Sequence, residues 1–231
     1  MTKSLAFSIF RTNYLCSTFR NEHLSHLESA YLALIGGCRW IQLSMNDATD
    51  EEIAHTVRQL KVACEGTDAV LTLEGHVELA QRLQVDGVFL TKKDMPADKA
   101  RKILGEDRII GCAANTFNDI RLLQALGADY VCCGPFRQTS AKKDVPALGL
   151  AGYRTLIHQM QAHNIDLPLM ATGGLTEEDI EPLTQLGTWM GIDMTDAILH
   201  ADNPVKAAKQ IQDKRFGTHI KKFIEEIEEQ E

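Results

Sequence analysis

The chain has 231 residues, of which 44% are hydrophobic, and its net charge at pH 7 is −8. That length and apolar content are enough for one large domain with a substantial core. The negative charge argues against broad nucleic-acid binding, which depends on clustered Lys and Arg side chains that displace counterions from phosphates. It does not exclude small anionic ligands, because a few local cations or backbone amides can hold them.

The cysteines and the N-terminus indicate the compartment. The six cysteines follow no Cys-x-x-Cys or other metal-ligand spacing, and most lie in apolar runs, so we expect reduced, buried thiols. The N-terminus carries no recognisable signal peptide, and no apolar run approaches the ~20 residues that span a bilayer. We therefore expect a cytoplasmic protein that does not bind membranes.

Short apolar runs alternate with longer segments of helical periodicity along most of the chain, which predicts βαβ units. The run at residues 6–10 is the candidate for an eighth strand, and helix starts are marked by Thr49, Thr116 and Thr176, whose hydroxyls can accept hydrogen bonds from free amides. The other predicted strands are, in chain order, residues 38–43, 69–73, 87–90, 108–112, 130–133, 167–171 and 191–194.

About eight strands, each followed by a helix, predict an α/β protein with a single (β/α)8 TIM barrel over residues 1–217. A doubly wound open sheet is the alternative, but no Gly-x-Gly-x-x-Gly fingerprint follows the first strand. Residues 218–231 have the pattern of an acidic amphipathic helical tail, which would serve as a solvated cap or as a contact in an oligomer.

Three loops that follow predicted strands carry residues suited to a phosphate. The loop within residues 128–150 is rich in Thr and Ser, and Lys142 could supply a point charge, although an ordinary polar loop would look the same. Gly173 and Gly174 allow backbone amides to approach an anion, and barrels often bind phosphate after strands seven and eight. Thr195 stands where the last helix of the barrel would begin. Together the three loops predict a phosphate cradle.

These and other segments resemble the thiamine phosphate synthases and their TenI-type relatives. The resemblance implies a (β/α)8 barrel and a transferase of thiamine biosynthesis, which couples hydroxymethylpyrimidine diphosphate to thiazole phosphate and releases pyrophosphate with the help of Mg2+. The segments that carry it are a Gly-Gly before a QL strand (36–43), VELA (77–80), DGVFLTKKDMP (86–96), LGEDRIIG (104–111), LGADYVCCGPF (126–136), PALGLAG (146–152) and ATGGLT (171–176).

On the thiazole-phosphate side, much of the family's pattern is kept. Thr139 and Lys142 match the first Thr and the Lys of the family's TxTK, with Ala141 at its second Thr. An ungapped match puts Thr195 on the phosphate-contacting Ser, whereas a shifted one puts Asp196 there. We prefer Thr195, since a carboxylate would repel a phosphate. The expected ligand is thiazole phosphate, and the expected contacts are Thr139, Ala141, Lys142, Gly173, Gly174 and Thr195.

On the pyrimidine-diphosphate side, the chain departs from the family. Synthases carry QLREK where this chain has QLSMN, so Ser44 and Asn46 replace an Arg and a Lys. Losing two charge-assisted hydrogen bonds of about 1.5–3 kcal/mol each should cost about 10²–10⁴-fold. The family's Asn-Asp pair appears as Glu74-Gly75. The expected pyrimidine-side contacts are Gln42, Ser44, Asn46 and Ala113; the metal positions are Asp94 and Glu74; and the catalytic candidates are Lys142 and Asp94.

Other residues could compensate for these losses. Lys92 and Lys93 precede Asp94, and Arg137 follows a strand, although the sequence favours solvated surface charges as the explanation of Lys92 and Lys93. TenI-type tautomerases use a His where this chain has Pro135, and His76 is the nearest substitute unless it is a surface or core histidine.

Three functions therefore remain open. They are a synthase with a rearranged diphosphate site, a TenI-like non-synthase that binds thiazole phosphate or a thiamine-related ligand, and another phosphate-binding barrel such as a sugar-phosphate epimerase. The third lacks an evident carboxylate pair or His constellation. The expected partners are a small phosphorylated heterocycle and a second copy of the chain in a homodimer, with no nucleic acid.

Overall fold

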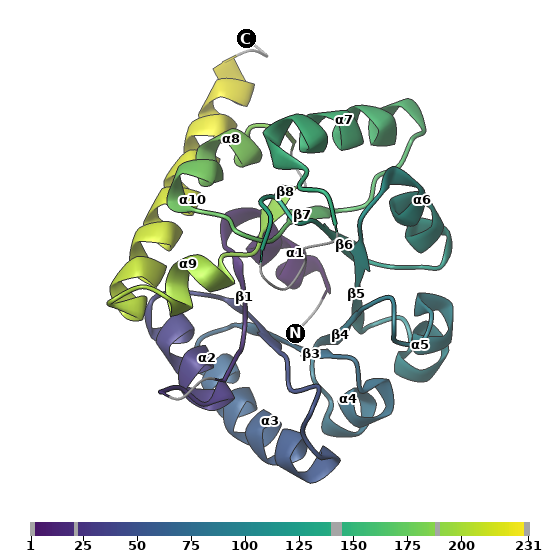
Figure 1. Ribbon diagram of the computed structural model, residues 1–231, viewed down its shortest axis with the longest axis vertical. Coiled ribbons are helices and arrows are strands. Elements are labelled where there is room, and N and C mark those ends of the chain that lie inside the picture. Colours follow the sequence, from purple (N-terminus) through teal and green to yellow (C-terminus); the bar gives the residue numbers. More distant parts are fainter. Residues whose placement is uncertain (1–2, 21–22, 140–144, 188–189, 229–231) are drawn as a thin grey trace.

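The computed structural model describes residues 3–20, 23–139, 145–187 and 190–228. Eight parallel strands form one sheet in the order β1 to β8. Nine of the ten α-helices in the described residues surround it as a ring, and the N-terminal helix lies inside that ring (Figure 1). The strands are β1 (Leu15–Ser17), β2 (Trp40–Leu43), β3 (Val70–Glu74), β4 (Gly87–Leu90), β5 (Ile109–Ala114), β6 (Tyr130–Cys133), β7 (Leu169–Ala171) and β8 (Met190–Ile192).

The helices follow the strands in alternation. They are α1 (Lys3–Thr12), α2 (His26–Ile35), α3 (Asp50–Glu65), α4 (Val77–Leu83), α5 (Ala97–Leu104), α6 (Phe117–Ala125), α7 (Gly149–Ala162), α8 (Ile180–Thr184), α9 (Thr195–Leu199) and α10 (Pro204–Glu228), with a short 3-10 turn before α8 (Glu177–Asp179). Thr49, Thr116 and Thr176 each form a capping box, so the predicted helix starts are confirmed.

The sheet closes into a barrel between its first and last strands. Leu15 bridges to Asp193, and the Met194 amide donates to the Leu15 carbonyl at 3.0 Å. The predicted (β/α)8 barrel is thereby confirmed, and the doubly wound alternative is excluded because the strand order never reverses.

The prediction of a strand at residues 6–10 is wrong, because this segment lies within α1. Ala6 and Phe10 are four residues apart and therefore share one helix face, and both are buried inside one end of the barrel. Phe10 packs edge-on against Trp40 at 5.9 Å and against Tyr130 at 5.7 Å between ring centroids. The first strand is instead the three-residue β1, which the sequence pattern did not identify.

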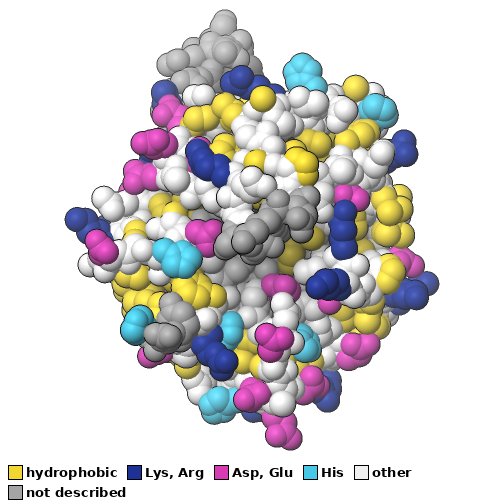
Figure 2. All heavy atoms as spheres, in the orientation of Figure 1, with side chains coloured by type: hydrophobic (Ala, Val, Ile, Leu, Met, Phe, Trp, Pro, Cys, Tyr) yellow, Lys and Arg dark blue, Asp and Glu magenta, His cyan; other side chains and the backbone are white. Residues whose placement is uncertain are grey.

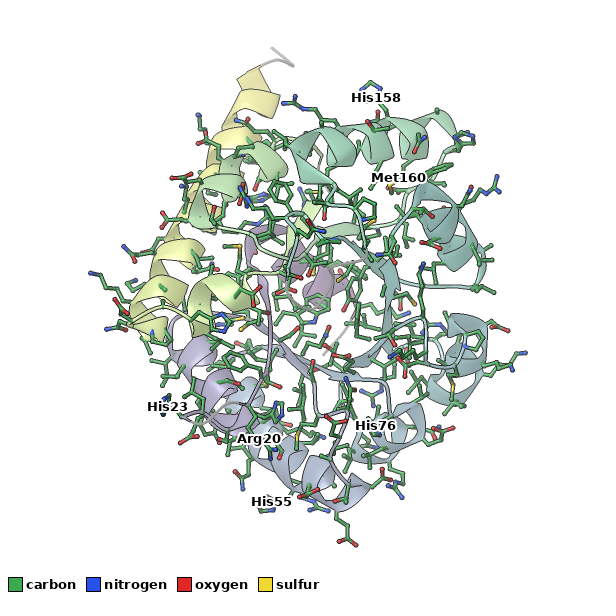
Figure 3. All side chains as sticks on the ribbon, in the orientation of Figure 1. Arg20, His23, His55, His76, His158 and Met160 are labelled. Atoms are coloured by element: carbon green, nitrogen blue, oxygen red, sulfur yellow. The ribbon has the colours of Figure 1, made fainter. Side chains whose placement is uncertain are left out.

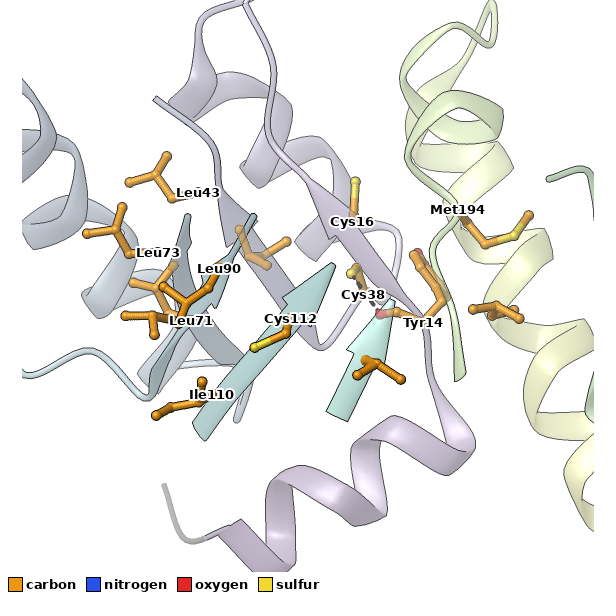
Figure 4. Close-up of a cluster of buried hydrophobic side chains, with 14 of the residues drawn as sticks. Tyr14, Cys16, Cys38, Leu43, Leu71, Leu73, Leu90, Ile110, Cys112 and Met194 are labelled. Atoms are coloured by element: carbon orange, nitrogen blue, oxygen red, sulfur yellow. Dashed lines mark hydrogen bonds between the residues drawn. The ribbon is translucent and has the colours of Figure 1, made fainter. Parts of the chain in front are cut away.

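Two apolar layers fill the molecule. The interior layer contains Phe10, Trp40 and Tyr130, and the larger layer fills the space between the strands and the helices (Figure 4). All six cysteines are buried thiols that form no disulfide, as expected. Burial raises the pKa of Cys38 to about 12, so this thiol stays protonated at neutral pH.

Helix α10 joins both ends of the fold. Arg215 is 1% exposed and donates hydrogen bonds to the Met190 carbonyl at 2.5 Å, to the Asn13 carbonyl at 3.3 Å and to the Thr184 hydroxyl. Burial lowers its pKa to about 10. The helix runs without a break through residues 217 and 218, so the expected boundary between barrel and tail falls inside it. Among the described residues, no helix is long and apolar enough to cross a bilayer.

Candidate functional site

A cavity of about 890 Å³ opens where the carboxyl ends of the strands meet, which is the usual position of a site in this fold. Leu15, Phe89 and Cys132 belong to the interior apolar layer and form its floor. Side chains alternate along a strand, so Ser17 is the next residue of β1 after Leu15 to face inward, and it stands one level above the floor. The polar wall above the floor is made by Ser17, Gln42, Asn46, Glu74, Asn115, Thr172 and Asp193. The cavity therefore suits a flat ring with polar edges.

The end of β2 is bound to the end of β3 through one carboxylate. Ser44 Oγ donates to Glu74 Oε2 at 2.5 Å, Gln42 Nε2 donates to the same oxygen at 3.3 Å, and Asn46 Nδ2 donates to Oε1 at 3.0 Å. We call these four residues the Glu74 cluster. Gln42 in β2 and Ser44 directly after it are two residues apart, so their side chains face the same side. Because β2 pairs with β3 in parallel, Glu74 at the end of β3 comes within reach of both. Ser44 and Asn46, the two positions at which the resemblance implies cations, thus donate to a carboxylate of the same chain.

The donor set around Asp94 does not reproduce a two-carboxylate magnesium site. Asp94 Oδ2 accepts from the Thr91 amide and hydroxyl, both at 2.7 Å. A Cβ built on Gly75 would lie 3.1 Å from Asp94 Oδ1, so a carboxylate side chain at position 75 would stand beside Asp94. Because residue 75 is a glycine, this second carboxylate is missing. Both oxygens of Glu74 already accept hydrogen bonds. In the described ranges, no three His, Cys, Asp or Glu side chains are grouped to hold a metal. The metal positions Asp94 and Glu74 stay a prediction.

The candidate compensating cations differ in their surroundings. Lys92 and Lys93 line the cavity, and Lys92 Nζ also pairs with Asp119 at 3.0 Å. Arg137 instead pairs with both oxygens of Asp179 at 2.5 and 2.8 Å, and it donates to the Gly174 carbonyl at 2.9 Å. Arg137 is therefore held at the loop after β7 and away from the cavity, whereas both lysines lie on the β4 side of the cavity, where Lys92 is shared with Asp119.

Charged side chains of both signs are interspersed over the rest of this face. Figure 2 shows no continuous basic surface among the side chains it colours. In Figure 3, His55 and His158 point outward from the ring of helices, whereas His76 lies at the start of α4. His76 lines the cavity, and its Nδ1 is 3.9 Å from Asp50 Oδ1.

The expected phosphate side is only partly described. Ala141 and Lys142 lie outside the described residues. Gly173 and Gly174 have φ values of +89° and +68°, which only glycine adopts readily, and a Cβ on Gly174 would lie 3.7 Å from the Thr139 methyl group. Thr139 and the glycine pair are thus brought together as expected.

A second cavity, of about 380 Å³, lies beside Gly174 and is also lined by Asp196. Thr195 is engaged elsewhere, because its hydroxyl donates to Asp193 at 2.5 Å and accepts from the Ser17 amide at 2.8 Å. The geometry therefore favours the shifted alignment, in which Asp196 rather than Thr195 lies next to the glycines. A carboxylate here weakens the expected phosphate cradle.

The sequence reasoning missed four residues of the polar wall, and Asp193 is the charged one among them; the other three are Ser17, Asn115 and Thr172. Asp193 follows β8 and accepts hydrogen bonds from the Thr172 hydroxyl at 2.8 Å and from the Thr195 amide at 3.1 Å. Burial raises its pKa above the ordinary aspartate value, although these hydrogen bonds act in the opposite direction. The available signal was a carboxylate inside the otherwise apolar strand segment MGIDM.

Comparison with known proteins gives a consistent result. A family model described as thiamine monophosphate synthase matches residues 14–197. Proteins named thiamine-phosphate synthase from Bacteroides fragilis and Bacteroides thetaiotaomicron are 49% and 47% identical over 195 residues, which cover 84% of this chain and 95% and 93% of theirs. A solved thiamine phosphate pyrophosphorylase from Pyrococcus furiosus shares the fold, with a TM-score of 0.78 and 24% identity over 90% of this chain and 98% of that one.

Proposed function

Because the chain belongs to the thiamine monophosphate synthase family, we propose that it acts in thiamine biosynthesis as a synthase-like transferase whose pyrimidine-diphosphate subsite is rebuilt around Glu74. The observation that carries this proposal is the set of hydrogen bonds from Gln42, Ser44 and Asn46 to the Glu74 carboxylate. In the coupling reaction, the bond from the pyrimidine methylene carbon to the diphosphate oxygen breaks, and the electron pair leaves with pyrophosphate. The thiazole nitrogen then donates its lone pair to the methylene carbon.

The Glu74 cluster opposes the first of these steps. Negative charge develops on the leaving pyrophosphate, and a site accelerates the step by holding cations or aimed donors where that charge appears. Here the three donors serve Glu74, and its carboxylate would repel the diphosphate. Among the described residues, Lys92 and Lys93 are the cations that line the cavity, so we assign to them whatever stabilisation of the leaving group survives.

The family uses Mg2+ in general, and the ion would supply charge neutralisation for the diphosphate. The residues of this chain do not fit a two-carboxylate site, because Gly75 stands beside Asp94 and both Glu74 oxygens are hydrogen-bonded. We therefore assign no step to a metal ion. Asp94 holds the turn before α5 through Thr91 and leaves only Oδ1 free of these hydrogen bonds.

A coupling assay tests the proposal. The pure protein is incubated with hydroxymethylpyrimidine diphosphate, thiazole phosphate and Mg2+, and thiamine phosphate is measured. We expect turnover about 10²–10⁴-fold below that of a family member with an intact diphosphate site, from the loss of two charge-assisted hydrogen bonds. Turnover equal to the intact member's would refute the proposal. In calorimetry with each substrate alone, thiazole phosphate should bind and the diphosphate should bind little; the opposite preference would contradict a phosphate cradle at Thr139 and Gly174.

His76 favours a second function, that of a TenI-like protein acting on thiazole phosphate or a thiamine-related ligand. It lines the cavity while Pro135 occupies the position of the tautomerase histidine, so His76 is the imidazole placed to move a proton there. Under this function, proton exchange at the thiazole would proceed without any pyrimidine and would be lost in His76→Ala. This second function would be excluded if the wild-type protein couples the two substrates and the His76→Ala protein still exchanges the proton at the thiazole.

We also propose a cytoplasmic homodimer. The buried thiols, which form no disulfide, support a reducing compartment. Phe216, Ile220 and Phe223 are 50%, 41% and 52% exposed and lie at helical spacing along α10, which suits a contact with a second copy. Sedimentation analysis should show a dimer that Phe216→Ser with Phe223→Ser converts to a monomer.

A further inference from the structure

Asp193 faces the ligand cavity from the seam of the barrel. Gly191, two residues earlier, points inward, because a Cβ built on it would lie 2.6 Å from the Phe10 ring in the interior layer. Side chains alternate along a strand, so residue 193 points the same way at the next level up. There it borders the cavity and is half-buried, although β1, β7 and α9 surround it. The carboxyl thus stands where a bound ring would lie.

Hydrogen bonds fix this carboxyl in place. Thr172 Oγ1 donates to Oδ2 at 2.8 Å, and the amide and hydroxyl of Thr195 donate to Oδ1 at 3.1 and 2.5 Å. The Ser17 amide in turn donates to the Thr195 hydroxyl at 2.8 Å, so β1 helps to hold the group that holds Asp193. An ionised carboxylate offers about four lone-pair positions. These contacts leave one on Oδ2 for a ligand.

The wall near Asp193 also contains Gln42. Gln42 is 5% exposed and lines the same cavity, and its Oε1 is buried with no hydrogen-bond partner in the part of the chain that the structure describes. Ser17 of β1 pairs in register with Gln42 of β2, so β1 alone separates Gln42 from Asp193. Gln42 Oε1 is enclosed and does not face the open cavity, so Asp193 is the acceptor that a ligand meets on this side.

We propose that Asp193 is a specificity-determining residue that selects an amino-substituted heteroaromatic ring in this cavity by accepting a hydrogen bond from its amino group. The ring lies over the apolar floor of Leu15 and Phe89, and its amino edge turns toward β8 and β1. The inference rests on the proposed function only in taking the pyrimidine as that ring. It does not depend on Ser44, Asn46 or Glu74, which would meet the diphosphate.

Calorimetry with two small rings tests the assignment. The probes are hydroxymethylpyrimidine, which carries an amino group and no phosphate, and the analogue in which an oxo group replaces the amino group. The wild-type protein should prefer the amino ring. Asp193→Asn keeps the size of the side chain and replaces one carboxylate oxygen, an acceptor, by an NH2 group, a donor. This variant should bind the amino ring about 10- to 100-fold more weakly than wild type does, and it should bind the oxo ring more tightly.

Asp107→Asn, in an exposed turn before β5, is the matched control and should leave both affinities unchanged. Asp193→Ser removes the carboxylate without adding bulk and serves if thermal unfolding shows that the Asn protein is not folded. An equal change for both rings, or no change for either, overturns the assignment, as does a wild-type protein that binds neither. Thiazole phosphate binding and coupling are measured separately, so that failure of this assignment is distinct from failure of the proposed function.

Discussion

The Glu74 cluster can be converted into a cationic edge by three substitutions, Ser44→Arg, Asn46→Lys and Glu74→Asn. The exchange removes one negative charge and adds two positive charges at the ends of β2 and β3. The three wild-type side chains already meet through hydrogen bonds of 2.5 and 3.0 Å to Glu74, so the new side chains start from positions within reach of one bound group. We expect the triple variant to bind hydroxymethylpyrimidine diphosphate far more tightly than wild type.

The magnitude follows from the surroundings of each position. Each new charge-assisted hydrogen bond is worth about 1.5–3 kcal/mol, which for two gives about 3–6 kcal/mol, or about 10²–10⁴-fold in Kd. Residue 44 is half-buried and should contribute near the upper value, whereas residue 46 is exposed and solvent screening reduces its share. We therefore expect a gain of about 10²–10³-fold, because one of the two bonds is screened.

Calorimetry at fixed ionic strength measures this gain. Glu74→Gln is the matched control, since it keeps the shape of the cluster and removes only the charge; it should recover about tenfold or less. Thiazole phosphate serves as the internal standard and should bind equally to all three proteins. A folded triple variant that binds the diphosphate no better than wild type would refute the reasoning that Glu74 occupies the diphosphate subsite.

Three further predictions concern stability and phosphate binding. Arg215→Met leaves buried acceptors without a donor, so it should lower the free energy of unfolding, measured in urea, by about 3–5 kcal/mol. The control Lys209→Met, on the exposed side of α10, should change that free energy by less than about 1 kcal/mol. Equal losses in the two variants would contradict the role of Arg215. Burial is the largest single influence on the pKa of Asp179 and raises it, but the hydrogen bonds from Arg137 and Thr176 and the charge of Arg137 together outweigh burial and lower that pKa. The stabilisation is therefore present above the unfolded-state pKa and is lost as pH falls through the folded one. Arg137→Ala should therefore shift acid unfolding, followed by circular dichroism, to higher pH, and an unchanged midpoint would count against it. Lys142→Ala should weaken thiazole phosphate binding in calorimetry by about 1.5–3 kcal/mol, and unaltered binding would remove Lys142 from the site.

Most of the barrel could be predicted because its strands are continuous apolar runs between turn residues. The strands at residues 87–90 and 130–133 match β4 and β6 residue for residue. The segment AFSIF was misassigned because a short apolar run satisfies a buried strand and a buried helix face equally. Only its tertiary partners, Trp40 and Tyr130, distinguish the two.

The site was predicted less completely, for a different reason. Family motifs located Gln42, Ser44, Asn46 and Glu74 individually, but their convergence on one carboxylate depends on the register between β2 and β3. Asp193 escaped notice because it has no motif and acquires its surroundings from Thr172 on β7 and Thr195 on α9. Sequence periodicity reports which face a residue occupies, but not which distant side chains share that face.

The helix that closes the base of the barrel separates two tasks. Phe10 and the rings around it hold the strands together from one end, whereas the residues that meet ligands stand at the other end, above the floor of Leu15 and Phe89. A substitution at the rim therefore removes few of the contacts on which folding depends. Selection on binding could place Ser44 and Asn46 where the resemblance implies an Arg and a Lys while the scaffold stayed intact. The same independence makes this rim a place where new ligand preferences can be engineered without first stabilising the protein.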